Sequence, residues 1–550
     1  MLRKLVKNVK KITSLLLIAV MIFGVAMPAF AAESVMGSRK NPIVYIRGNG
    51  NPIYDRYGYQ SYPLSVNDDE LTSALVDELM DDFVKAVTLG KWEEYYDAFE
   101  TELAEYFEGC ALDENGDIAN DSGIANVCYE INETNMNSNY LKKDGNSELF
   151  SYVFWYDWRL DPFEIAARLD DYIDHVLAAT GAEKVSIVGK CLGGSFLLAY
   201  LAEYGGEKIR RVAFDCTVGG GCEEASDLFS GKANIDFEAM ERRYLDDNDL
   251  INSGYMSGGQ SQILLNDFIR ATLNAINEKD RLKLTEKAVN KIYQKLSKEL
   301  TPRLCMATFG GWPGYWTNVT KDSYEDAKNI IFYGAVEGYA EKYKGLIEKL
   351  DKYDRLVRQR IPELLKSVEA EGVDFGVLSK YGYQLSPYIE SNDMLGDSLV
   401  SLTASSFGAT CSKVYDTLSN KYIFERQQAG LGKYISPDKQ VDASTCVFPD
   451  STWIVKGMTH ENWAECNDDL IYLICTSEEP LTVNSLEEYP QFTVYNSAEK
   501  KLVAMTEENC NTTNWDAADI KAHGIVQYFK AIYEFFQALI AYMKDLILNR

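Results

Sequence analysis

The feature that most constrains the fold is a glycine-rich turn at residues 189–194, with the sequence GKCLGG. The preceding run, 184–188 (KVSIV), is rich in β-branched residues and is typical of a buried strand. The following run, 195–201 (SFLLAYL), is typical of a helix. The pattern predicts a strand, a sharp turn and a helix, with Cys191 at the turn. Amides at a helix N-terminus stabilise a negative charge, so Cys191 is a candidate nucleophile.

This pattern resembles the nucleophile elbow of the α/β-hydrolases, in which Gly-x-nucleophile-x-Gly joins a strand to a helix. Most of those enzymes carry a serine at the central position, where this chain carries Cys191. The alternative is a structural cysteine buried in a glycine-rich turn. Strand patterns at 149–156 and 209–215 and a helical pattern at 162–180 continue the alternation. Together they predict an α/β-hydrolase fold, with a mostly parallel sheet flanked by helices.

The chain of 550 residues is long enough for one large domain with insertions. We expect the first part of the α/β core at 33–222, because the strand and helix alternation falls there. The pattern from 223 to 390 is mainly helical, which predicts a cap inserted between two core strands. The second part of the core is expected at 391–480.

Several shorter elements are expected in the last third of the chain. Strand patterns occur near 398–404, 445–456 and 469–476, and a hairpin pattern covers 491–505. The C-terminal extension, 481–550, ends in an amphipathic helical pattern from Ile525 to Leu548. This helix is expected to pack on the body of the protein. Its large apolar face makes contact with a membrane surface an alternative, and the cap could make such a contact too.

Residues 1–32 have the pattern of a secretory signal peptide. Five Lys or Arg residues precede an apolar stretch at 15–25, and Ala29-Phe30-Ala31 has the small-x-small cleavage pattern. Cleavage near Ala31 predicts a secreted or cell-surface protein, with a retained membrane anchor as the alternative. The segment contains no acidic residue, so its removal changes the net charge from −28 to −33. Such an acidic chain disfavours nucleic acid as a partner.

The chain has 11 cysteines, and an odd number in an exported protein leaves at least one of them unpaired. Cys191 is the candidate for the unpaired thiol. The others could form up to five disulfides, or remain free thiols in a reducing habitat. No C-x-x-C motif is present, and the acidic run at 113–117 lacks the full spacing of a calcium loop. We therefore expect no metal and no cofactor.

A cysteine nucleophile requires a base, and histidine is scarce in this chain. Of the three histidines, His460 follows a strand-like run late in the chain, where the α/β-hydrolase order places the base. His175 precedes the nucleophile within an amphipathic helical pattern, and His523 lies beyond the expected core. We predict that His460 is the base.

The acid that orients the base should lie between the cap and His460. Asp397 follows a glycine and precedes an apolar run, so it is the preferred candidate, with Asp393 and then Asp442 as alternatives. Any one of these residues could instead be a solvated turn residue in so acidic a chain.

Stabilisation of an oxyanion requires two backbone amides that point to the developing charge. One is expected from Leu192, which follows the nucleophile, and the other from the loop that ends the early strand at 42–46. Asn49 is preferred in this loop, with Gly50 as the alternative. Gly48 is expected to lie against the substrate.

Short motifs connect this chain with a particular family. YDWRL lies at 156–160, about thirty residues before the elbow, TVGG follows at 217–220, and GDSLV and GMTH surround Asp397 and His460. These motifs resemble those of the lecithin:cholesterol acyltransferase family of lipid acyltransferases and phospholipases. The resemblance implies a Cys-His-Asp triad acting on lipids or other acyl esters, with Trp158 and Arg159 at the substrate.

The chain departs from that family at the nucleophile and in the oxyanion loop. Cysteine forms a thioester, which favours attack by amines, thiols or positioned alcohols, so acyl transfer is as plausible as hydrolysis. A polyhydroxyalkanoate-synthase-like enzyme is an alternative because such enzymes share the Gly-x-Cys-x-Gly-Gly elbow, but a secreted protein lacks access to acyl-CoA. A catalytically silent protein that binds a lipid or a partner is the other alternative.

Overall fold

The computed structural model describes most of the chain between residues 37 and 510. Apart from single residues and short gaps within them, the described ranges are 37–48, 53–62, 82–119, 123–124, 138–243, 279–460, 465–496 and 499–510. The predictions for the signal peptide, for Asn49 and for the C-terminal helix lie outside these residues.

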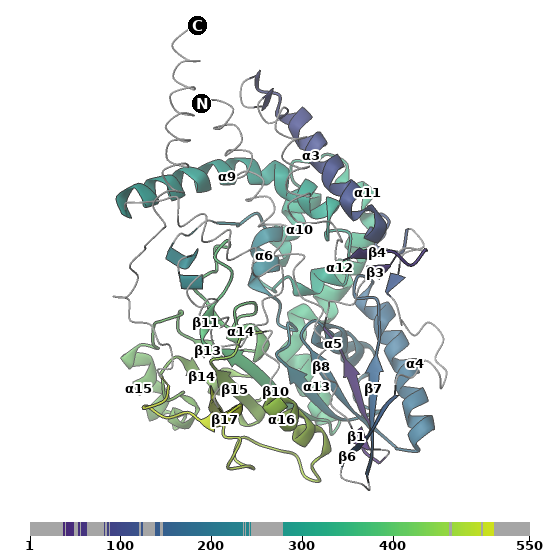
Figure 1. The fold of residues 1–550 in the computed structure, drawn as a ribbon, viewed down its shortest axis with the longest axis vertical. Helices are drawn as coiled ribbons and strands as arrows, with labels where there is room; N and C mark the ends of the chain where they lie inside the picture. Colours follow the sequence, from purple (N-terminus) through teal and green to yellow (C-terminus); the bar gives the residue numbers. More distant parts are fainter. Residues whose placement is uncertain are drawn as a thin grey trace.

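A ten-stranded sheet forms the centre of the molecule (Figure 1). Its main path runs through β7, β2, β8, β9, β10, β15 and β16, and all neighbours along this path are parallel. At the edges, β17 is antiparallel to β16, while β1 and β6 are antiparallel to β7. The mostly parallel sheet confirms the predicted α/β-hydrolase fold. The strands in chain order are β1 (Gly37–Ser38), β2 (Ile43–Ile46), β6 (Ser138–Lys143), β7 (Ser147–Phe154), β8 (Val185–Lys190), β9 (Ile209–Asp215), β10 (Asp374–Tyr381), β15 (Thr452–Lys456), β16 (Phe492–Asn496) and β17 (Lys501–Ala504).

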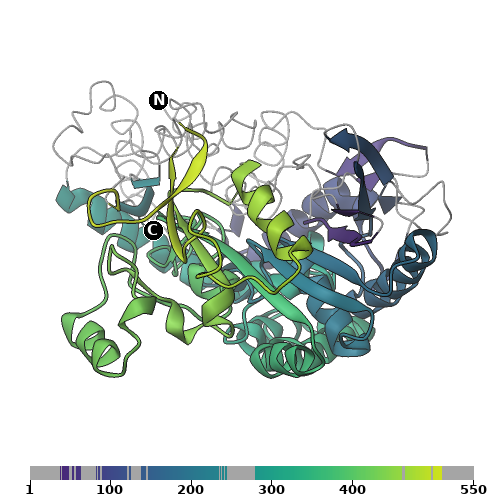
Figure 2. The ribbon, with the colours of Figure 1, turned by 90° about the horizontal axis from the view of Figure 1, so that it is seen from below.

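Helices cover both faces of the sheet, on opposite sides of the strands (Figure 2). On one face, α4 (Pro162–Thr180) and α13 (Ile361–Ala370) pack beside α5 (Gly193–Tyr204) over the largest apolar cluster. On the other face, α16 (Glu465–Thr476) packs over a second cluster that includes Tyr45, Val188 and Leu378. Alternate residues of the strands enter the two clusters, as expected for a sheet buried on both faces.

Helix α4 illustrates how the local sequence sets these boundaries. The Asp161 carboxylate accepts a hydrogen bond from the Phe163 amide at 3.0 Å, and Pro162 occupies the first turn. The helix ends at Gly181, whose φ of 72° few other residues adopt readily. Apolar residues at helical spacing form its buried face, so the predicted amphipathic helix at 162–180 is confirmed.

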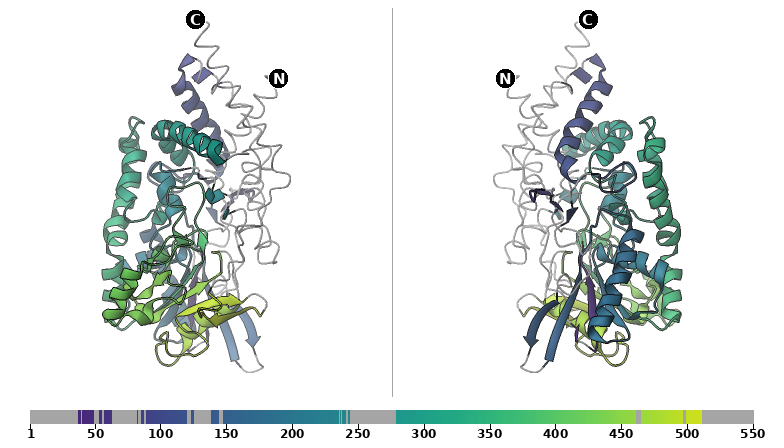
Figure 3. Two further views of the ribbon diagram at one scale, coloured as in Figure 1. Left: turned by 90° about the vertical axis from the view of Figure 1, so that its left-hand side faces the viewer. Right: turned by 90° about the vertical axis from the view of Figure 1, so that its right-hand side faces the viewer.

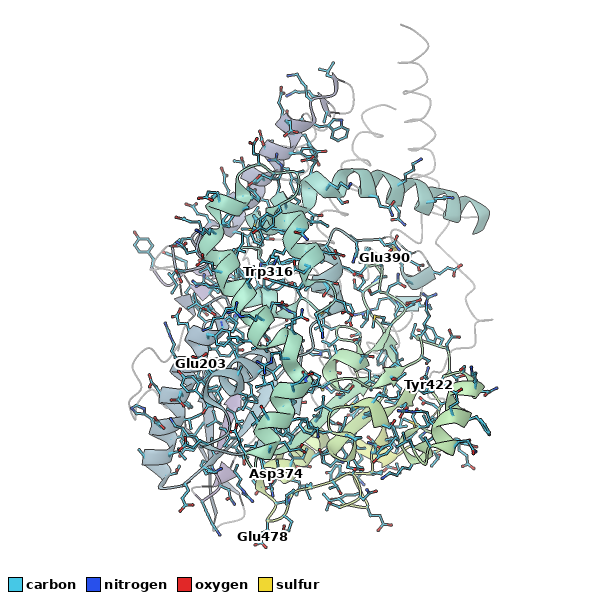
Figure 4. All side chains as sticks on the ribbon, turned by 180° about the vertical axis from the view of Figure 1, so that it is seen from behind. Glu203, Trp316, Asp374, Glu390, Tyr422 and Glu478 are labelled. Atoms are coloured by element: carbon cyan, nitrogen blue, oxygen red, sulfur yellow. The ribbon has the colours of Figure 1, made fainter. Side chains whose placement is uncertain are left out.

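A long helical insertion separates β9 from β10. It contains α6 (Glu223–Phe229), α9 (Lys279–Ala307), α10 (Tyr324–Phe332), α11 (Tyr339–Lys342) and α12 (Lys344–Leu356), and it leads into α13. Figure 3 shows these helices rising along one side of the molecule, where α9 crosses near α3 (Trp92–Phe107). Trp316 lies fully buried among them (Figure 4).

The insertion ends earlier than the sequence suggested. We expected the cap to reach residue 390, but β10 begins at Asp374 and lies between β9 and β15 in the sheet. Its sequence, DFGVLSKY, contains polar residues and a glycine, which are not typical of a central buried strand, so the pattern did not predict one. Ser379 and Lys380 are nevertheless fully buried. Gly376 is required because a Cβ there would lie 2.6 Å from a side-chain atom of Ile474 on α16.

Two further expectations were wrong. Residues 398–404 form turns and the start of α14 (Leu402–Ser405), because the Ser401 side chain caps this short helix. Residues 469–476 belong to α16, because their apolar side chains repeat at helical spacing and pack on one face of the sheet. The 445–456 region contributes β15 only at its end. The hairpin predicted at 491–505 is confirmed as β16 and β17.

The structure also constrains disulfide and membrane chemistry for the residues it describes. Each of the ten cysteines in the described ranges is a free thiol. Within those ranges, no helix combines the length and apolar character needed to cross a bilayer, and no cluster of His, Cys, Asp and Glu is arranged to hold a metal ion.

Candidate active site

The candidate site lies at the carboxyl ends of the parallel strands. The opposite end of the sheet is marked by Asp374 and Glu478, which lie close together at one end of the molecule (Figure 4). Arg211 links them, with Nε 3.4 Å from an Asp374 carboxylate oxygen and Nη2 donating to the Glu478 carbonyl at 3.3 Å. Loops at the carboxyl ends are the usual place for ligand binding in such sheets.

Cys191 occupies the tight turn between β8 and α5, with a φ of 51°. Close approaches explain the neighbouring glycines. A Cβ at Gly189 would lie 2.9 Å from the Cα of Gly194, and one at Gly194 would lie 1.8 Å from Oγ1 of Thr217. A Cβ at Gly193 would lie 2.3 Å from a carbonyl oxygen at the end of β2. The turn is therefore the strained strand-to-helix elbow that the sequence predicted.

The structure brings the three predicted triad residues together. Nε2 of His460 lies 3.1 Å from Sγ of Cys191, and Nδ1 of His460 lies 2.7 Å from Oδ2 of Asp397. Their side chains come from the β8–α5 turn, from the loop after β15 and from the turn before α14. They are almost completely buried, with exposures of 5% for Cys191, 2% for His460 and 0% for Asp397. A chain of hydrogen bonds thus connects acid, imidazole and thiol in a site shielded from water.

The second oxygen of the Asp397 carboxylate stabilises the backbone turn that follows Asp397. Oδ1 accepts hydrogen bonds from the backbone amides of Leu399 at 3.2 Å and Val400 at 2.8 Å. The His460 amide also donates to the Asp397 carbonyl at 2.6 Å. The carboxylate is thereby fixed in an orientation that leaves Oδ2 for the imidazole.

Electrostatics favour the protonated form of His460. Burial alone lowers the pKa of the imidazole, but the negative charges of Asp397 and Cys191 and the hydrogen bonds to both raise it to about 10. At neutral pH the imidazole is therefore cationic when Cys191 is a thiolate. Such an ion pair is the reactive form of a cysteine nucleophile.

Two parts of the site fit an oxyanion hole. Leu192 is the N-cap residue of α5 and directly follows the nucleophile, as expected. The loop after β2 lies against the thiol, because a Cβ at Gly48 would be 2.8 Å from Cβ and 3.2 Å from Sγ of Cys191. Gly48 therefore lies next to the sulfur of Cys191, while Asn49 falls outside the described residues.

Tyr156 is a site residue that the sequence interpretation overlooked. Its hydroxyl donates a 2.6 Å hydrogen bond to the carbonyl of Arg47, one residue before Gly48. The ring is 1% exposed and packs at a tilt against Phe196 of the elbow helix, with 4.6 Å between the ring centroids. Tyr156 thus fixes the loop beside the thiol, and its place at the start of YDWRL was the available signal.

Trp158 and Arg159 do not have the surroundings expected of substrate-binding residues. Arg159 is fully buried and makes two hydrogen bonds to the Asp157 carboxylate, at 3.0 and 2.6 Å, and a third to the Cys110 carbonyl at 2.8 Å. Trp158 is 1% exposed and packs edge-to-face on Trp312. Trp158 thus packs against the insertion, while Arg159 forms a bidentate buried pair with Asp157, a typical structural contact. A role of either residue at the substrate stays a prediction.

The alternative acids lie elsewhere. Asp393 forms an ion pair with Lys413 at the surface, and Asp442 accepts a 2.6 Å hydrogen bond from Nε of Arg426. Neither contacts His460.

The insertion supports the turn that carries the acid. The Glu223 carboxylate accepts hydrogen bonds from Oγ of Ser401 at 2.5 Å and from its amide at 3.2 Å. Arg243 donates to the Ser398 carbonyl at 3.0 Å. No sequence signal marked Glu223 or Arg243, because charged residues in a helical segment usually face solvent.

Comparison with known proteins supports the fold. Residues 151–329 match the family described as alpha/beta hydrolase fold. The match begins in β7, includes the elbow, and extends into the helical insertion. A search of curated proteins found no match to this chain.

Proposed function

We propose that this chain, which contains an α/β-hydrolase domain, is an acyl-transfer enzyme with Cys191 as its nucleophile. The observation that supports the proposal is the hydrogen-bonded chain from Asp397 through His460 to Cys191. A structural cysteine would not require a buried histidine beside its sulfur. Burial of a charged imidazole is unfavourable unless a negative group compensates its charge, and here Asp397 and the Cys191 thiolate can do so.

In the first step, the Cys191 thiolate attacks the carbonyl carbon of an ester. A C–S bond forms, and the carbonyl oxygen becomes an oxyanion facing the Leu192 amide and the Gly48 loop. The imidazolium of His460 gives its proton to the leaving alcohol as the C–O bond breaks, while Asp397 keeps Nδ1 protonated. The products are a free alcohol and a thioester on Cys191.

In the second step, an acceptor attacks the thioester. His460, now neutral, removes the proton from water, an alcohol or an amine as the new bond to the carbonyl carbon forms. The C–S bond breaks and the thiolate returns with the imidazolium. The identity of the acceptor decides between hydrolysis and transfer, and thioester chemistry favours a positioned alcohol or amine over bulk water.

The substrate class proposed here is a lipid or another acyl ester, met outside the cell. Its support is the resemblance of the YDWRL, GDSLV and GMTH motifs to lipid acyltransferases, together with the signal-peptide pattern of residues 1–32. Contact with a membrane surface through the insertion or the C-terminal segment belongs to the same proposal.

Intact-mass spectrometry tests the acyl-enzyme directly. The mature protein is incubated with a short-chain acyl ester and with a phospholipid, as wild type, Cys191→Ala and Cys411→Ala. Cys411 is the matched control because it is another thiol, is partly exposed, and contacts Thr403 rather than His460. We expect an acyl-sized mass gain in the wild type and in Cys411→Ala, removable by hydroxylamine, and none in Cys191→Ala.

The opposite result identifies the binding-protein alternative. If no adduct forms, no ester is consumed, and Cys191 alkylates no faster than Cys411, the chain is not a thiol acyltransferase. A catalytically silent protein that binds a lipid or a partner then becomes the better interpretation.

A further inference from the structure

A buried ion pair lies directly beneath the nucleophile. Nζ of Lys190, the residue before Cys191, lies 3.2 Å from Oδ2 of Asp215, and both side chains are less than 5% exposed. Lys190 ends β8 and Asp215 ends β9, and the two are register partners in the sheet. The Asp215 carbonyl also accepts a 3.1 Å hydrogen bond from the Cys191 amide. The pair is thus attached to the backbone of the nucleophile.

A second buried lysine connects this pair with the base. Lys380 of β10 is fully buried, and its Nζ donates to the His460 carbonyl at 3.4 Å. Its charge also reaches Asp215: burial raises the pKa of that carboxyl, but Lys190 and Lys380 together lower it below its usual range. Adjacent strands β8, β9 and β10 therefore place two cations and one anion under the catalytic pair.

Other titratable groups define the boundary of this cluster. Asp468 of α16 faces it from the second layer, where burial raises its pKa to about 6 against the opposing effect of the two lysines. Burial raises the pKa of the neighbouring Cys216 thiol; Lys380 and Lys190 oppose this increase, whereas Asp215 and Asp397 add to it. Nζ of Lys190 also lies 6.0 Å from the centre of the Tyr45 ring.

Packing alone does not explain these groups. Burial of charged side chains is unfavourable, and apolar residues of similar size often stabilise a core as well or better. The Lys380 ammonium contacts the backbone carbonyl of His460, and the backbone carbonyl of Asp215 contacts the amide of Cys191, which offers a functional reason for the position of the cluster.

We propose that Lys190, Asp215 and Lys380 are positioning residues that hold the nucleophile and the base together and set the pH range in which Cys191 reacts. The proposal rests on Cys191 being the nucleophile of the proposed function. Lys380 has two separable roles: its hydrogen bond positions His460, and its charge favours the thiolate.

The direction of the charge effect follows from electrostatics. Loss of the Lys380 cation disfavours the thiolate and favours retention of the imidazolium proton, so both limbs of the pH profile move to higher pH. Loss of the Asp215 anion moves both limbs to lower pH. At an effective dielectric constant of about 20, one unit charge in the same buried cluster shifts such a midpoint by roughly one pH unit.

The test measures the rate at which iodoacetamide alkylates Cys191 across a series of pH values, with the Cys191 peptide quantified by mass spectrometry. This readout needs no substrate. The variants are Lys380→Met, Lys380→Gln and Asp215→Asn. Lys456→Met is the matched control, because Lys456 is a buried lysine of the next strand, β15, that pairs instead with Asp438 at 2.8 Å.

We expect the midpoint of alkylation to rise by roughly one pH unit in both Lys380 variants, to fall in Asp215→Asn, and to stay unchanged in Lys456→Met. Turnover of a short acyl ester, measured at the pH optimum of each variant, separates the two roles of Lys380. Both Lys380 variants lose the hydrogen bond to the His460 carbonyl and should lose roughly tenfold or more in kcat with little change in KM, whereas Asp215→Asn keeps that hydrogen bond and should retain kcat.

Each alternative result is decisive. Wild-type Cys191 that alkylates like an ordinary thiol refutes the proposed function. A reactive wild-type thiol whose midpoint stays constant in Lys380→Gln and Asp215→Asn refutes the role of the cluster and leaves the function intact. If Lys380→Met does not fold, as judged by circular dichroism, Lys380→Gln and Asp215→Asn still test the proposal, because their alkylation midpoints are expected to shift in opposite directions.

Discussion

Replacement of Asp397 by asparagine is the most informative single change at the triad. The backbone amides of Leu399 and Val400 donate to Oδ1, so the asparagine side chain must place its oxygen there to keep the turn. Its NH2 group then faces Nδ1 of His460, where an acceptor stood before. The imidazole must accept at Nδ1 and carry its proton at Nε2, which points to Cys191. In this tautomer His460 cannot act as a base.

The magnitude follows from the charge that is lost. The pKa of His460 is about 10, against an ordinary value of 6.5, and Asp397 is the strongest of the influences that raise it. Each pKa unit corresponds to about 1.4 kcal/mol, so losing one to two units lowers the equilibrium constant for the ion pair, relative to the neutral pair, about 10- to 100-fold. The wrong tautomer adds to this loss, and serine hydrolases lose about 10⁴-fold from the same change. We expect kcat/KM to fall by about 10² to 10⁴.

The assay is single-turnover acylation by a chromogenic short-chain ester, because it isolates the first chemical step. Asp393→Asn is the control: this residue lies on the same loop but pairs with Lys413 at the surface. An Asp397→Asn enzyme that acylates at the wild-type rate, in a protein where Cys191→Ala is inactive, would show that Asp397 does not orient the base.

Three further predictions concern the surroundings of the triad. Gly48→Ala should lower the acylation rate roughly 10- to 100-fold, because its Cβ would lie 2.8 Å from Cβ of Cys191 and displace the nucleophile; unchanged burst kinetics would contradict this. Arg159→Met should destabilise the fold by about 3–5 kcal/mol in urea unfolding, because it leaves Asp157 charged and unpaired; a loss of substrate affinity with unchanged stability would instead support Arg159 as a binding residue. The pKa of His460 is higher in the folded than in the unfolded state, so protonation of its imidazole stabilises the fold. This contribution to the free energy of unfolding is complete below about pH 6.5. It is lost as the pH rises towards 10, by at most about 1.4 kcal/mol per pH unit. Urea unfolding of wild type and His460→Gln between pH 6 and 10 should show a difference that shrinks with pH, and a constant difference would argue against the protonated imidazole.

The site was predictable where local rules act strongly. The elbow has only one favourable backbone path, so its glycines identified Cys191, and the fixed order of nucleophile, acid and base led to Asp397 and His460. The same rules could not show Tyr156 as a support for the Gly48 loop, because that contact joins residues far apart in the sequence.

The errors have a common physical cause. Lys380 is fully buried, although lysines are usually exposed, so β10 was not recognised; the complete burial of Arg159 was equally absent from the sequence pattern. In α16, Leu470 and Ile471, and Ile474 and Cys475, are adjacent apolar pairs, a pattern that also occurs in a buried strand. Only the contacts of these residues with the sheet distinguish a helix from a strand here. Burial of charge depends on tertiary partners, which local sequence does not contain.

The hydrogen bond from His460 to Cys191 joins residues separated by 269 positions in the chain. The bond joins the loop after β15 to the turn after β8, so it closes a very long loop of the chain. With Cys191 as the proposed nucleophile, we expect its reactivity to require both segments and therefore to report on the assembled sheet. A fragment that ends before residue 460 lacks the imidazole and should not reproduce this reactivity.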